Sequence, residues 1–139
     1  MKLQISTIAK TTYESADVDR VTVPTEAGEI TILNRHIPLI SLLKPGVVKI
    51  IHTDKTEEFL AVSTGAIEVQ SNVDEPTKII ILADQADRAG SIDLEVVQKA
   101  KERATAALAK PQTLSEKEYK TLIADLAMQE ARIKAATRA

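Results

Sequence analysis

Cysteine is absent from this chain of 139 residues, and histidine occurs only twice. Without cysteine the chain has no disulfide, no thiolate nucleophile and no thiolate ligand for zinc, and two histidines argue against a multi-histidine metal site. Aromatic residues make up only 2% of the chain, which leaves almost no side chains on which nucleobases could stack. The formal net charge of -2 provides no strong field to attract nucleic acid or acidic lipid. The composition therefore favours neither a metalloenzyme nor a nucleic-acid-binding protein.

Long apolar runs are also missing. No run approaches the ~20 apolar residues of a membrane-spanning helix. The N-terminal residues, MKLQIST, lack the apolar core of a signal peptide. We therefore expect a chain that lies outside the bilayer, and the lack of cysteine suits a reducing compartment.

The pattern of residues 2–83 is that of short β-strands. Apolar and polar residues alternate in several segments, and turn-forming pairs such as Asp54-Lys55 and Thr64-Gly65 separate them. The expected strands include Leu3 and Ile5 and the segments 20–23, 29–33, 47–51, 59–62, 67–70 and 79–82. Many short strands with frequent turns predict an antiparallel β-sandwich or barrel.

The composition changes after Gly90, where glycine disappears and Pro111 is the only proline. Alanine, lysine and glutamate dominate this part, and they are strong helix formers. Apolar residues recur at helical spacing in two stripes: Val97, Ala100, Ala104 and Leu108, then Tyr119, Leu122, Leu126 and Ile133. We expect Ser91 to cap the first helix and Ser115 with Glu118 to form a capping box on the second.

Together these patterns predict two domains of an α+β protein. Residues 1–84 form a mostly β N-terminal sandwich, and residues 85–139 form an antiparallel two-helix hairpin that is interrupted at Lys110-Pro111.

A polar corner stands out between residues 25 and 46, TEAGEITILNRHIPLISLLKPG. Asn34-Arg35-His36 lies between the alternating run 29–33 and the apolar run 37–43, and we expect both runs to be buried. No nucleophile or metal ligand accompanies Glu29 and His36, so a catalytic site is not indicated. The residues alone fit either a contact with a partner or two solvated loop side chains.

The same stretch resembles the epsilon subunits of bacterial F-type ATP synthases. The matching residues are Gly28-Glu29, Ile32-Leu33, His36 and Pro38-Leu39, followed by the segments 44–50 (KPGVVKI), 79–84 (IIILAD) and 86–89 (ADRA). The chain departs from the usual family pattern at Thr31, Asn34 and Arg35, where that pattern has Gly, Pro and Gly. The resemblance covers essentially the whole chain in the right order.

The resemblance implies a non-catalytic subunit of the central stalk, without a cofactor or a metal. Such a subunit binds the gamma subunit and the membrane rotor ring, and it couples proton flow to ATP synthesis at the cytoplasmic face of the plasma membrane as a peripheral component. Carried over, the corner residues Glu29, Arg35 and His36 would contact the rotor ring.

In the family the helical hairpin inhibits ATP hydrolysis by laying basic side chains against the catalytic alpha/beta head. The corresponding candidates here are Arg103, Lys110, Arg132 and Lys134. Such charges also form an ordinary solvated face when glutamates lie four residues away, as in Glu116–Lys120 and Glu130–Lys134.

Two other functions stay open. Some family members bind ATP through an Ile-Asp-x-x-Arg-Ala signature, which suggests a nucleotide-sensing module built on Asp87, Asp93 and Arg103. This chain has Val96 at the position of the signature arginine and Glu130 where another arginine is expected, so the bidentate contact with phosphate is lost. The other alternative is an unrelated β-sandwich adaptor whose helical hairpin acts as a clamp.

Overall fold

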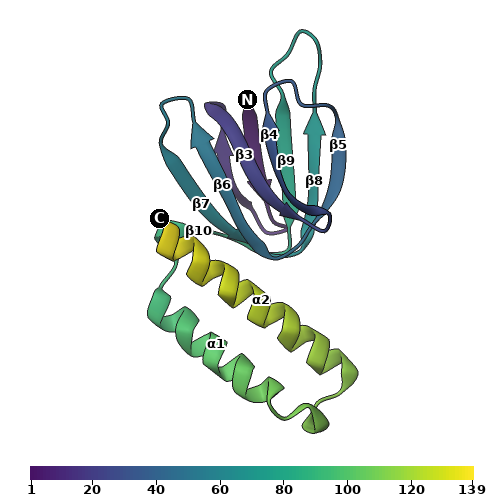
Figure 1. Ribbon diagram of the computed structural model, residues 1–139, viewed down its shortest axis with the longest axis vertical. Helices are drawn as coiled ribbons and strands as arrows, with labels where there is room; N and C mark the ends of the chain where they lie inside the picture. The colour runs from purple at the N-terminus through teal and green to yellow at the C-terminus, as the bar shows by residue number, and fades with distance from the viewer.

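The computed structural model describes residues 1–139. Strands come first along the chain: β1 (Lys2–Ser6), β2 (Thr11–Ser15), β3 (Val18–Thr25), β4 (Gly28–Leu33), β5 (Leu39–Leu43), β6 (Gly46–His52), β7 (Glu57–Val62), β8 (Gly65–Gln70), β9 (Lys78–Ala83) and β10 (Ala86–Arg88). Helices follow: the 3₁₀ turn η1 (Ala89–Ser91), α1 (Leu94–Leu108), the 3₁₀ turn η2 (Pro111–Thr113) and α2 (Glu116–Arg138). The order confirms the predicted fold class, a β-sandwich followed by two helices (Figure 1).

The strands form one sheet that folds over on itself. Their order is β10-β7-β6-β3-β5-β8-β9-β1-β2, with β4 paired to β3. Thr25–Leu43 is the only residue pair that joins β3 to β5, and the sheet bends there into two layers. We call β10, β7, β6, β3 and β4 the helix-side layer, and β5, β8, β9, β1 and β2 the open layer (Figure 1).

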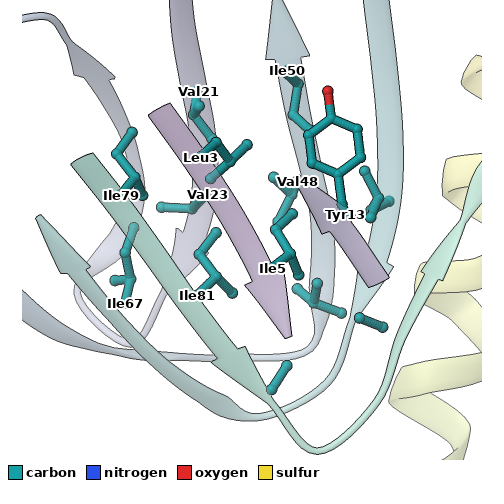
Figure 2. Close-up of a cluster of buried hydrophobic side chains, with 14 of the residues drawn as sticks. Leu3, Ile5, Tyr13, Val21, Val23, Val48, Ile50, Ile67, Ile79 and Ile81 are labelled. Carbon is teal, nitrogen blue, oxygen red and sulfur yellow. The ribbon is translucent and has the colours of Figure 1, made fainter. Parts of the chain in front are cut away.

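Alternating apolar side chains fill the space between the two layers. In the open layer Ile67 pairs with Ile81, and Ile81 pairs with Ile5, so these three fully buried side chains form one row. Val21 and Ile50 face them from the helix-side layer (Figure 2). The period of two in the sequence thus places one side of each strand in the core.

The apolar run 37–43 was expected to be buried, and this expectation was wrong. In the structure Ile37, Ile40 and Leu42 are 74%, 77% and 64% exposed, whereas Leu43 is buried. Residues 39–43 form β5, so successive side chains point to opposite faces of the sheet, and one face of the open layer is not covered by this chain. The whole run was therefore expected to be buried, whereas only alternate residues of the strand face the core.

Two short strands were not predicted. β2 pairs with β1, and β10 pairs with β7 immediately after the expected end of the sandwich at residue 84. The apolar core of the sandwich and the apolar cluster under the helices are separate, which supports a division into two parts. That these parts fold independently remains a prediction.

The helix starts show one wrong and one confirmed expectation. The first helix is capped by Asp93, whose carboxylate accepts hydrogen bonds from the backbone N–H groups of Glu95 and Val96. Ser91 instead ends η1, and its hydroxyl donates to the carbonyl of Arg88. At the second helix the hydroxyl of Ser115 accepts from the backbone N–H of Glu118 at 3.1 Å, as predicted.

Helix α2 lies between the sandwich and α1 (Figure 1). Its buried apolar residues are Met128, Ala131 and Ala135, which pack against Val47, Phe59 and Ala61 of the helix-side layer and Ala89 of η1. The stripe predicted for this helix was different: Tyr119 is 42% exposed, and Leu122, Leu126 and Ile133 are half-buried. Alanine carries little hydrophobic signal in a sequence, which explains why the face toward the sandwich was missed.

Candidate functional site

The polar corner between β4 and β5 is a fixed turn. Arg35 has a φ of 65°, in the left-handed region. Its backbone N–H donates to the hydroxyl of Thr77 at 2.7 Å, and the side-chain oxygen of Asn34 accepts from the backbone N–H of Thr77. Because Thr77 is buried, the corner is attached to the core at the start of β9. The side chain of Arg35 remains exposed and His36 is half-buried.

Glu29 does not lie at this corner. It is the second residue of β4, beside Gly28, whereas Arg35 and His36 follow the other end of the strand. At about 3.3 Å per residue the Cα atoms of Glu29 and Asn34 are ~16 Å apart. Glu29, Thr31 and Leu33 alternate on the exposed side of β4, and this row leads into the corner. The three predicted residues therefore belong to an exposed strip along β4 rather than to one compact site.

The outer face of the open layer is apolar. Leu42 and Leu82 are 64% and 56% exposed, and both pair with Ala66 of β8, so they form a row across three strands. Ile40 and Ile80 lie in the next row, separated by Glu68. Apolar side chains gathered in this way on a surface are typical of an interface. This surface was not predicted, because the run 37–43 was expected to be buried and residues 79–82 were expected only to form a strand.

The proposed nucleotide residues do not all come together. Asp87 and Asp93 line one cavity of about 320 Å³ at the root of the hairpin, with Val96 and Arg132 also in its wall. Arg103 lies elsewhere on α1, with Lys99 and Glu102. Asp93 is occupied in capping α1, and Asp87 forms an ion pair with Arg132. The cavity thus lacks an uncommitted guanidinium for a phosphate.

Arg132 makes the main polar contact between α2 and the sandwich. Its Nε donates to Oδ2 of Asp87 at 2.7 Å, one terminal nitrogen donates to Oε1 of Gln85 at 2.9 Å, and the other donates to Oε1 of Gln129 at 3.2 Å. The side chain of Arg132 is only 22% exposed. Sequence reasoning had singled out Asp87 and Arg132 for different roles, and nothing in their spacing indicated that they meet.

The other basic candidates on the hairpin are spread apart. Lys110 is exposed between the two helices, and Lys134 lines a groove of about 470 Å³ with Lys101, Glu130 and Gly46. Arg103 is exposed on α1. Of the expected helix pairs, Lys120–Glu116 forms at 3.4 Å, whereas Glu130 makes no ion pair with Lys134.

A polar cluster formed by residues of β2, β6 and β7 was not predicted. Nε2 of His52 lies 2.8 Å from Oε1 of Glu58 and 3.2 Å from the hydroxyl of Tyr13, and Nδ1 lies 3.0 Å from the carbonyl of Asp17. Burial lowers the pKa of His52, but the hydrogen bonds to Glu58 and to the carbonyl of Asp17 outweigh it and raise the pKa above its usual value. Burial and the nearby Glu58 raise the pKa of Tyr13 to about 12. No group of three or more His, Cys, Asp or Glu side chains is arranged to hold a metal ion.

Neither helix is long and apolar enough to cross a membrane. Residues 1–89 match the family model described as "ATP synthase, Delta/Epsilon chain, beta-sandwich domain". An ATP synthase epsilon chain from Dichelobacter nodosus is 46% identical over 97 residues, which are 70% of this chain and 64% of the relative. Another from Acidithiobacillus ferridurans is 40% identical over 120 residues, 86% of this chain and 79% of that one. The match thus spans less than two thirds of the first of these relatives.

Two solved structures share the fold at low sequence identity. One is from the mitochondrial ATP synthase of Euglena gracilis, described as "OSCP/F1/c-ring in rotational state 1", with a TM-score of 0.77, 23% identity and coverage of 97% of this chain and 79% of that chain. The other is from the central stalk/c-ring of the Tetrahymena thermophila mitochondrial enzyme, with a TM-score of 0.60, 15% identity and coverage of 98% and 96%. At these identities the likeness shows the fold.

Proposed function

The chain belongs to the delta/epsilon-chain family of ATP synthases, and on this premise we propose that it is a non-catalytic subunit of the central stalk of a bacterial F-type enzyme. In this role it links the gamma subunit to the membrane rotor ring, couples proton flow to ATP synthesis, and sits peripherally at the cytoplasmic face of the plasma membrane. The proposal rests on the match of the β-sandwich to the family model and on the difference between the outer faces of the two layers. Helix α2 packs on β6 and β7 of the helix-side layer, whereas no part of this chain covers the apolar outer face of the open layer.

We assign the apolar face of the open layer to the gamma subunit. Leu42, Leu82 and Ala66 form its centre, and burial of such side chains stabilises a complex by roughly 25 cal/mol per Å² of apolar surface, before the costs of association. Replacement of both leucines by aspartate should abolish co-purification with gamma while the sandwich stays folded. Ile8→Asp is the matched control, because Ile8 is fully exposed in the turn between β1 and β2. Normal capture of gamma by the double variant would refute the assignment.

The strip along β4 is our candidate for the rotor-ring contact. Exposed charged groups at a rim give register and orientation more than affinity, so their loss should weaken coupling and leave assembly intact. Glu29→Ala and the pair Arg35→Ala with His36→Ala should be compared separately, because the two sites lie at opposite ends of β4. Proton-driven ATP synthesis in reconstituted vesicles should fall in both. Unchanged synthesis in both variants, with normal assembly, would exclude the strip.

The helical hairpin is proposed to inhibit ATP hydrolysis through Arg103, Lys110, Arg132 and Lys134, in contact with the catalytic alpha/beta head. For this contact the hairpin must leave the sandwich, and it is attached there mainly through α2. Removal of the residues after Gly90 should therefore raise hydrolysis by the assembled complex. Equal hydrolysis rates of full-length and truncated complexes would remove the inhibitory role.

ATP sensing is the alternative function, and its candidate site is the cavity at the root of the hairpin. Asp87 and Asp93 both line it, but the signature arginine is Val96 and Arg132 is already paired. A ligand shifts a conformational equilibrium only by its difference in affinity for the two states. We therefore expect little control of the hairpin by ATP. Titration calorimetry of the isolated subunit with ATP and Mg²⁺ tests this, and micromolar binding, about -8 kcal/mol, would favour the alternative.

A further inference from the structure

The contact between α2 and the sandwich combines a small apolar interface with a single cluster of charge-assisted hydrogen bonds. Apart from Met128, the apolar residues that α2 buries are alanines. The N-terminal half of α2 extends past the sandwich, and Ile123 there is 45% exposed. With so little apolar area, polar contacts have a large share in deciding whether the hairpin stays docked.

Arg132 is the centre of that cluster, and each of the three nitrogens of its guanidinium donates one hydrogen bond. One donor is directed at the carboxylate of Asp87, one at Gln85 and one at Gln129. Gln129 is itself only 6% exposed, and its amide donates to Asp125 one helical turn earlier. Asp87 and Gln85 belong to the sandwich, so the cluster joins two parts of the chain that are 45 residues apart.

We propose that the hairpin is held in its docked position by a network of Arg132, Asp87, Gln85 and Gln129, which we call the Arg132 network. While Arg132 is bound in this network, its guanidinium cannot contact a partner of the released hairpin. The three hydrogen bonds of the guanidinium must break before α2 can leave β10. In the released hairpin, Arg132 is then free to contact an acidic partner. The effect of this exchange on hydrolysis rests on the function proposed above, whereas the docking itself does not.

The geometry favours Asp87 as the partner that sets the strength of the network. An ion pair on a protein surface usually contributes little, but this pair is partly shielded, with Arg132 22% and Asp87 36% exposed. The 2.7 Å contact from Nε and the 2.9 Å contact to Gln85 fix the plane of the guanidinium. Loss of the carboxylate leaves that group without a counter-charge.

The experiment measures hairpin docking directly in the isolated, full-length subunit. Because the chain has no cysteine, a donor and an acceptor dye can be attached specifically to cysteines introduced as D74C and A124C. Asp74 lies in the exposed β8–β9 loop and Ala124 is exposed on α2. Figure 1 shows this loop at the end of the sandwich opposite the helices, so the two sites are far apart in the docked state. Energy transfer followed during a urea titration gives the docking equilibrium constant of each variant.

Asp87→Asn and Arg132→Met should each raise the undocked fraction about tenfold, as expected for loss of a charge-assisted hydrogen bond. The double variant should be no worse than the more affected single variant, because both substitutions break the same interaction. Arg138→Met is the matched control: it removes a charge from the exposed end of α2, which makes no ion pair, and should leave docking unchanged. Unchanged docking in both single variants, or strictly additive effects, would overturn the proposal.

Hydrolysis by the assembled complex separates this proposal from the inhibitory function. Asp87→Asn releases the hairpin but keeps Arg132, so it should lower hydrolysis. Arg132→Met also releases the hairpin but lacks the group proposed to contact the catalytic head, so it should inhibit less. If both variants undock and neither changes hydrolysis, the Arg132 network stands and the inhibitory function fails.

Discussion

Met128→Ala is the sharpest test of how the helical hairpin is attached. Met128 is 2% exposed and is the one large apolar side chain that α2 buries against the sandwich. Substitution of a buried methionine by alanine costs about 2–5 kcal/mol. The methyl groups of Ala131 and Ala135 contribute only about 0.8 kcal/mol each, so Met128 supplies at least roughly half of the apolar contribution of the helix. At the lower limit the docking constant should fall about 30-fold.

The structure also predicts what this substitution leaves unchanged. Met128 contacts the cluster under the helices and none of the residues of the main core. The energy transfer of the labelled D74C/A124C subunit should therefore change at a lower urea concentration, while the unfolding free energy of the sandwich stays the same. Ile81→Ala is the opposite control, because Ile81 is fully buried in the main core and its truncation should destabilise the sandwich by about 2–5 kcal/mol. Equal destabilisation of the sandwich by both variants would refute the separation of the two clusters.

The remaining predictions concern the sandwich itself. A fragment that ends at Gly90 should unfold cooperatively on its own, and a non-cooperative transition in urea would show that the hairpin completes its core. Gly65→Ala should destabilise the sandwich by about 1–3 kcal/mol, since a Cβ there would lie 2.0 Å from the carbonyl oxygen of Leu82; Gly90→Ala, with open space around it, is the neutral control in the same thermal melt. The pKa of His52 is higher in the folded protein than in the unfolded chain, where it is about 6.5. The hydrogen bonds of protonated His52 therefore stabilise the fold fully below about pH 6.5, and this contribution is lost as pH rises through the folded-state pKa. The free energy of unfolding, measured in urea at several pH values, should therefore fall as pH rises through this range, and the fall should be absent in His52→Gln. The same fall in His52→Gln would assign the pH dependence to another group.

The Arg132 network illustrates the limit of reading residues along the chain. Asp87 was considered as a ligand for nucleotide and Arg132 as a contact for catalytic subunits, each on the basis of resemblance. The structure brings the two together over 45 residues because β10 and α2 pack against the same strand, β7. Helical spacing and strand alternation describe residues that are close in the sequence, so they cannot predict a contact between residues 45 positions apart.

The amino-acid sequence by itself determined the fold class and most of the elements, although not the short strands β2 and β10. Alternation in segments such as 67–70 specified strands, the change of composition after Gly90 specified helices, and Ser115 specified the start of α2, since each of these signals depends on neighbours within a few residues. Only the tertiary structure decided which apolar face stays uncovered. Ile40 and Leu42 are as apolar as the core residues, and they are exposed because no second layer packs on the outer side of β5. Burial is a property of what lies opposite a side chain, and the strand order that decides this is set by pairings between distant parts of the chain.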